Sequence, residues 1–160
     1  VKDAADSLYE AAGKLTDTSA SKSLFKKADK VTNDITSAVK DYVKNYNSLI
    51  EEAADTTNSK VTGKVSFMTG QANAYKSSLE KVGITINSDK TLSIDEDTFK
   101  KSDISDVKKL FNGSGSMAYQ TFVRASDISS AAENASASVT SYGADGMYNN
   151  YYNSAYNWYL

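Results

Sequence analysis

The sequence has 160 residues, of which 40% are hydrophobic, and its formal net charge is -2. This length suits one domain, and the near-neutral charge offers no basic surface of the kind that nucleic-acid binding requires. The chain contains no Cys, His or Pro, which excludes disulfides, thiolate and imidazole catalysis, and the common nitrogen and sulfur metal ligands. No apolar run reaches membrane-spanning length.

Two helices are predicted in the first third of the chain. Ala4, Leu8, Ala11 and Leu15 lie on one face of a short helix. After the polar link TDTSAS, apolar residues alternate in steps of four and three, as in a coiled-coil seam: Leu24, Ala28, Val31, Ile35, Ala38 and Tyr42. This spacing predicts a helix over residues 21–54, roughly 50 Å long at 1.5 Å per residue. Asn45 falls at the next seam position, where a buried polar side chain would restrict register between helices.

A second seam follows the polar turn DTTNSK. Its residues keep the same alternation: Val61, Val65, Met68, Ala72, Tyr75, Leu79 and Val82. The short turn predicts that this helix returns antiparallel against the first. Gly63 and Gly70 each weaken it by about 1 kcal/mol relative to Ala.

The stretch VGITINSDKTLSIDED, residues 82–97, combines acids with alternating apolar residues. A calcium loop of the EF-hand type is excluded, because Thr91 and Leu92 stand where a ligand and the central Gly belong. The alternation around the turn NSDK instead predicts two short strands, 84–86 and 92–94. Asp95 is placed to cap the following helix, with Glu96 and Asp97 in its first turn.

The rest of the chain is predicted to be helical up to residue 141. Short helical pieces cover residues 99–111, and Gly113–Ser116, which lacks the ending of a phosphate loop, separates them from the next helix. A third seam of small residues follows: Ala118, Thr121, Ala125, Ile128, Ala132, Ala135 and Val139. All three seams are interpreted as ordinary bundle core.

Residues 142–160 form a Tyr/Asn-rich C-terminal tail without a clear period. One interpretation is a flexible tail that lays aromatic rings on the bundle, and the other is an adhesive or self-associating end. Stacking on carbohydrate is a further alternative. The candidate interaction residues are Tyr148, Tyr151, Tyr152, Tyr156, Trp158 and Tyr159.

Four pieces of the chain follow one another as in a known family. Val43, Tyr46, Asn47 and Leu49 match a helix of the type F-V-x-x-Y-N-x-L, and residues 82–85 and 91–95 match G-I-T and T-L-S-[LI]-D motifs. Val107, Leu110 and Phe111 match V-x-x-L-F. This region resembles the C-terminal region of the flagellar filament cap protein, also called flagellar hook-associated protein 2. Lys90 stands where the family motif has Gly.

The resemblance implies an exported, non-enzymatic structural module, located outside the cell at the bacterial flagellum or cell surface. Its implied partners are copies of itself or flagellin-type subunits. The patterns predict a mainly α fold, an antiparallel coiled-coil helical bundle with one small β-hairpin at about residues 83–95. We expect a bundle over residues 1–141, no catalytic or metal site, no cofactor, no nucleic-acid partner and no membrane span. The alternative function is an extracellular glycan- or peptide-binding module that uses the aromatic tail.

Overall fold

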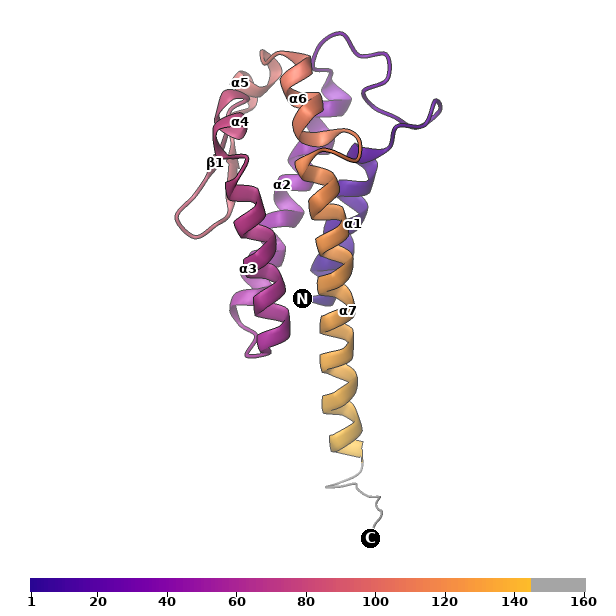
Figure 1. The fold of residues 1–160 in the computed structure, drawn as a ribbon, viewed down its shortest axis with the longest axis vertical. Helices are drawn as coiled ribbons and strands as arrows, with labels where there is room; N and C mark the ends of the chain where they lie inside the picture. Colours follow the sequence, from indigo (N-terminus) through magenta and orange to yellow (C-terminus); the bar gives the residue numbers. More distant parts are fainter. Residues whose placement is uncertain (145–160) are drawn as a thin grey trace.

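A computed structural model describes residues 1–144 of the chain. The long helices of this part form an antiparallel bundle: α1 (Lys2–Thr16), α2 (Asn33–Ala54), α3 (Ser59–Asn73) and α7 (Met117–Ala144). Helix α1 packs against α2 and α7, and α3 packs against the same two helices (Figure 1). The predicted mainly helical fold is confirmed.

The contacts between α1 and α7 show that these helices are antiparallel. Lys2 at the start of α1 lies 3.7 Å from Glu133, Asp6 accepts a hydrogen bond from Ser129, and Tyr9 stacks on Phe122. The α7 residue number thus falls as the α1 number rises. The buried side of α7 follows the predicted seam and consists of Met117, Ala118, Thr121, Ala125, Ile128 and Ala132.

The predicted helix over residues 21–54 is wrong in its first third, because α2 begins at Asn33. Residues 17–32 form turns and bends in which short polar side chains accept hydrogen bonds from backbone N–H groups near them, and these bonds compete with helix formation. Thr32 then caps α2 by accepting a hydrogen bond from the Ile35 N–H at 3.1 Å. Phe25, which is 1% exposed, anchors the segment to the core.

The predicted helix over residues 61–82 is interrupted at residues 74 and 75. Helix α3 ends at Asn73, and a separate helix, α4 (Lys76–Lys81), follows. The Gln120 side-chain amide donates a hydrogen bond to the Tyr75 hydroxyl at 2.8 Å. After the interruption, α4 packs against β1 and α6.

The residues between α3 and α7 fold as a small head, residues 76–111, at one end of the bundle (Figure 1). It comprises α4, β1 (Ile84–Ile86), β2 (Leu92–Ile94), α5 (Glu96–Lys100) and α6 (Ile104–Phe111). The strands are antiparallel, with Ile84 opposite Ile94 and Ile86 opposite Leu92, so the predicted hairpin is confirmed. At the other end, α7 continues past α1 and α3 (Figure 1). No helix among residues 1–144 is long and apolar enough to cross a membrane.

Candidate functional site

The hairpin is fastened to α2 by a single amide side chain. Asn47 Oδ1 accepts a hydrogen bond from the Leu92 N–H at 2.7 Å, and its Nδ2 donates to the Leu92 carbonyl at 2.8 Å. These groups belong to the outer edge of β2, where a third strand or water would otherwise have to satisfy them. Asn47 occupies that position and so fixes the head on the bundle.

Gly83, at the start of the hairpin, is required by both its conformation and its surroundings. Its φ is +83°, and a Cβ there would lie 2.9 Å from Thr98 Cβ and 3.0 Å from the Asp95 carbonyl oxygen. The Gly83 carbonyl also accepts a hydrogen bond from the Asp95 N–H at 2.8 Å. Only Gly allows the chain ends of the hairpin to approach this closely.

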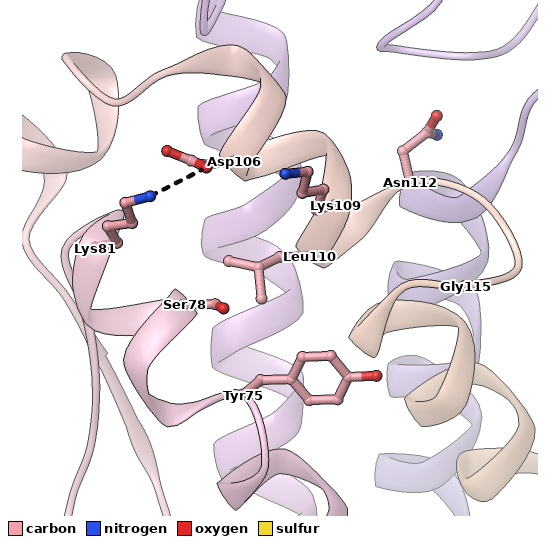
Figure 2. A pocket seen from close by; sticks show the side chains of 8 residues that line it. All are labelled: Tyr75, Ser78, Lys81, Asp106, Lys109, Leu110, Asn112 and Gly115. Carbon is pink, nitrogen blue, oxygen red and sulfur yellow. Dashed lines mark ion pairs between the residues drawn. The ribbon is translucent and has the colours of Figure 1, made fainter.

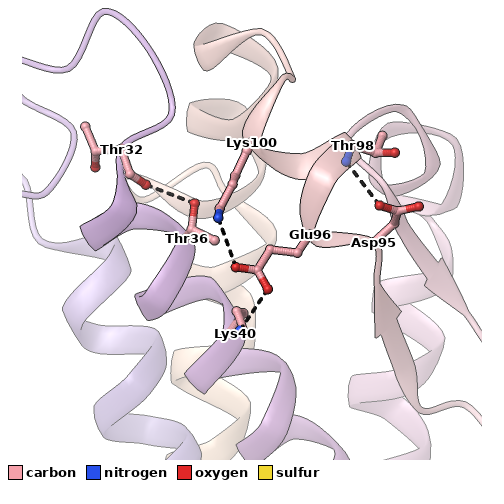
Figure 3. A network of polar contacts seen from close by, with 7 residues as sticks. All are labelled: Thr32, Thr36, Lys40, Asp95, Glu96, Thr98 and Lys100. Atoms are coloured by element: carbon pink, nitrogen blue, oxygen red, sulfur yellow. Dashed lines mark hydrogen bonds and ion pairs between the residues drawn. The ribbon is translucent and has the colours of Figure 1, made fainter.

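The acids after the hairpin have structural roles. Asp95 caps α5 by accepting a hydrogen bond from the Thr98 N–H at 3.1 Å, as predicted. Glu96 lies 2.9 Å from Lys40 of α2 and 3.2 Å from Lys100 of α5 (Figure 3). The hydrogen bonds from Lys40 and Lys100 lower the pKa of Glu96 below its ordinary value. Within residues 1–144, no group of three or more His, Cys, Asp or Glu side chains is placed to hold a metal ion.

Two tyrosines of α2 lie at the centre of the bundle. The Tyr42 hydroxyl hydrogen-bonds to Thr121 of α7 at 2.8 Å, whereas the Tyr46 hydroxyl is buried without a partner among the described residues. Burial raises the pKa of both phenols far above the ordinary value. Both side chains are therefore neutral core residues at physiological pH.

A groove of about 540 Å³ lies between α4, α6 and the loop that precedes α7 (Figure 2). Lys81 and Asp106 form an ion pair across it at 3.6 Å, and Lys109 adds a second amine. The Asn112 amide donates to the Leu15 carbonyl at 2.8 Å and so ties the loop after α6 to the end of α1. Among its lining residues, the Tyr75 hydroxyl accepts a hydrogen bond from the Gln120 amide at 2.8 Å.

Large apolar side chains are exposed on the outer faces of α1, α3 and α7. Tyr9 stacks on Phe122 with ring centroids 4.2 Å apart, and Phe122 stacks on Tyr119 at 6.0 Å. On the α3 side of α7, the Arg124 guanidinium lies 4.7 Å from the centroid of the Phe67 ring. Such surfaces are typical of contacts between proteins. Residue spacing does not predict these surfaces, because the residues lie off the apolar seams.

The predicted interaction residues fall in two places. Asn45 is half-buried, and its amide donates to the Asp41 carbonyl of its own helix at 2.9 Å; its role in fixing register stays a prediction. Helix α7 continues to Ala144, so it includes the first residues of the predicted tail. The aromatic residues Tyr148, Tyr151, Tyr152, Tyr156, Trp158 and Tyr159 lie outside the described residues.

A family model described as the flagellar hook-associated protein 2 C-terminus matches residues 60–157 of the chain. The chain belongs to this family. The match extends from α3 through the head and α7 and includes the motifs at residues 82–85, 91–95 and 107–111, whereas the motif at residues 43–49 on α2 lies before it. Searches of curated proteins and of solved structures give no match.

Family membership implies a structural role for this fold. Flagellar hook-associated protein 2 is a non-enzymatic structural protein located outside the cell, at the tip of the flagellar filament. Within the matched range, Gly83 closes the hairpin, and Phe111 packs edge-on against Tyr42 with ring centroids 5.6 Å apart. Asn47, which lies before that range, holds β2. These contacts maintain the fold.

Proposed function

We propose that this chain is an assembly module of a flagellar cap, which binds copies of itself and flagellin-type subunits. Membership of the hook-associated protein 2 family carries the proposal. Exposed aromatic residues on long, well-packed helices support it, because rigid apolar surfaces bind partners at a low cost in conformational entropy. The aromatic tail is a second proposed contact, since Tyr and Trp combine a large contact area with a polar group.

Sedimentation velocity over a range of concentrations tests the proposal. We expect the full chain to associate with itself or with added flagellin-type subunits, and a chain lacking residues 145–160 to associate more weakly. This truncation leaves α7 intact to Ala144, so circular dichroism should show an unchanged fold. A chain that stays monomeric and binds no flagellin-type subunit would contradict the proposal. A glycan-array signal that disappears with the same truncation would instead support the glycan-binding alternative.

A further inference from the structure

The outward face of α3 carries an exposed strip around Phe67, on which the Arg124 guanidinium lies 4.7 Å from the ring centroid. Phe67 is 54% exposed and is flanked by Gly63 and Gly70, four residues before it and three after it. A Cβ on either glycine would meet nothing within 4 Å. Each glycine costs the helix about 1 kcal/mol relative to Ala, and packing within the described chain requires neither. Their absent side chains leave the Phe67 ring accessible to another helix.

A basic groove of about 400 Å³ runs beside this strip, between α3 and α7. Lys60 and Lys64 line it together with Phe67 and the Arg124–Asp127 pair. Both lysines are exposed, and neither forms an ion pair within residues 1–144. They lie near the N-terminus of α3, which has no acid in its first turn and where the helix dipole disfavours positive charge. A negatively charged partner would offset this unfavourable interaction with the helix dipole.

An acidic stripe lies on the outer face of α1. Asp3, Asp6 and Glu10 are spaced three and four residues apart, so they share one side of the helix next to Tyr9. Asp3 and Glu10 are exposed and form no ion pair with the described residues. Asp6 is paired with Lys2 at 2.7 Å, so Asp3 and Glu10 give the stripe its negative charge. The stripe therefore has the opposite charge to the groove and, like it, an exposed aromatic ring.

Helix α7 shows that the stripe and the groove lie at the same height on the bundle. On one side of α7, Asp6 bonds to Ser129 and Tyr9 stacks on Phe122. On the other side, Lys60 and Lys64 also line a neighbouring hollow together with α7 residues between positions 127 and 138. The Phe67 ring lies under Arg124. Two copies placed side by side with parallel axes would thus bring acids against lysines and Tyr9 against Phe67.

We infer that the α1 stripe of one copy docks in the α3/α7 groove of a second copy. This inference rests on the proposed function, whose self-association it assigns to a surface. The contact is heterologous, because two different faces meet, so its repetition closes a ring or extends a chain of copies. A contact along two helix turns is small, which predicts weak, concentration-dependent and salt-sensitive association.

Charge reversal on each face, followed by mixing, tests the inference. The first variant is Lys60→Glu with Lys64→Glu, and the second is Asp3→Lys with Glu10→Lys; Asp6 is kept because it bonds to Ser129. We expect the wild type to associate at low salt and each variant alone to associate at least tenfold more weakly, since like charges then meet. An equimolar mixture of the two variants should associate again, because every contact joins opposite charges.

A matched control carries Lys26→Glu and Lys27→Glu, which reverse two exposed lysines in the loop over residues 17–32. It should associate like the wild type, and thermal denaturation should show that all variants are folded. Wild-type association that survives both reversals, or a mixture that stays monomeric, would overturn this interface and leave the proposed function standing. A wild type that binds flagellin-type subunits without self-association would also overturn only the interface.

Discussion

Lys90 is the one non-glycine residue among residues 1–144 with a positive φ, at +75°. Its N–H bonds to the Asn87 carbonyl at 3.0 Å, and the Asn87 N–H bonds to the Thr91 carbonyl at 2.8 Å. These bonds close a three-residue hairpin loop, in which the left-handed position favours Gly. Side chains in this conformation cost about 1 kcal/mol or more, so the hairpin retains local strain where the family motif has Gly.

Replacement of this residue measures the strain. We expect Lys90→Gly to increase the free energy of unfolding by about 0.5–1 kcal/mol, because the relief of strain exceeds the entropy that Gly adds to the unfolded chain. Lys90→Ala is the matched control: it removes the same exposed side chain but keeps the strained Cβ, and should stay within about 0.5 kcal/mol of the wild type. Urea denaturation compares the two. Equal stabilities of the Gly and Ala variants would contradict the assignment of strain.

At the scale of elements, Asn47 couples the hairpin to α2. We expect Asn47→Ala to reduce the free energy of unfolding by about 2–4 kcal/mol, because it leaves the N–H and carbonyl of Leu92 without their partners. Asn45→Ala, two residues earlier, loses only a bond within its own helix and should cost less than about 1 kcal/mol.

Hydrogen exchange at Leu92 separates a loosened hairpin from a general loss of stability. In Asn47→Ala, the Leu92 amide should exchange faster than amides of the α7 core at the same denaturant concentration. Equal destabilisation of the chain by Asn47→Ala and Asn45→Ala would show that the hydrogen bonds between Asn47 and Leu92 do not hold the hairpin on α2.

The elements could be predicted where periodicity alone determines burial. The α7 seam and the 84–86 and 92–94 strands follow their residue patterns because each has one buried side. Residues 21–31 continue the same seam spacing but are not helical, since Ser19 and Ser23 bond to nearby N–H groups. Hydrophobic spacing does not reveal this competition between side chain and backbone.

The candidate interface could be predicted from the sequence less well than the fold. Gly63 and Gly70 indicate only a weakened helix until the structure shows that both lie on its outer face. Lys60 and Lys64 are ordinary surface residues until α7 places them at the height of the α1 acids. Surface complementarity depends on how distant segments pack, and no local pattern in the sequence records it.

For the whole molecule, the buried tyrosines of α2 link stability to pH. Tyr42 packs against Phe111 of the head and hydrogen-bonds to Thr121 of α7. The ring centroids of Tyr42 and Tyr46 are 6.0 Å apart. Burial raises the pKa of both phenols above the ordinary value of 10.0. Below pH 10 both the folded and the unfolded states keep these protons, so the tyrosines cause no pH dependence there. Above pH 10 the unfolded state loses its protons first, and unfolding becomes more favourable.

We expect the free energy of unfolding to fall by about 1.4 kcal/mol per pH unit for each buried tyrosine above pH 10. Lysines also titrate in this range, and comparison with Tyr46→Phe isolates the tyrosine contribution. This variant loses no hydrogen bond among the described residues, so its stability at pH 7 should match or exceed that of the wild type. Between about pH 10.5 and 12, urea denaturation should show a slope with pH that is smaller by about 1.4 kcal/mol per unit. Parallel pH profiles for the two proteins would mean that Tyr46 ionises in the folded bundle.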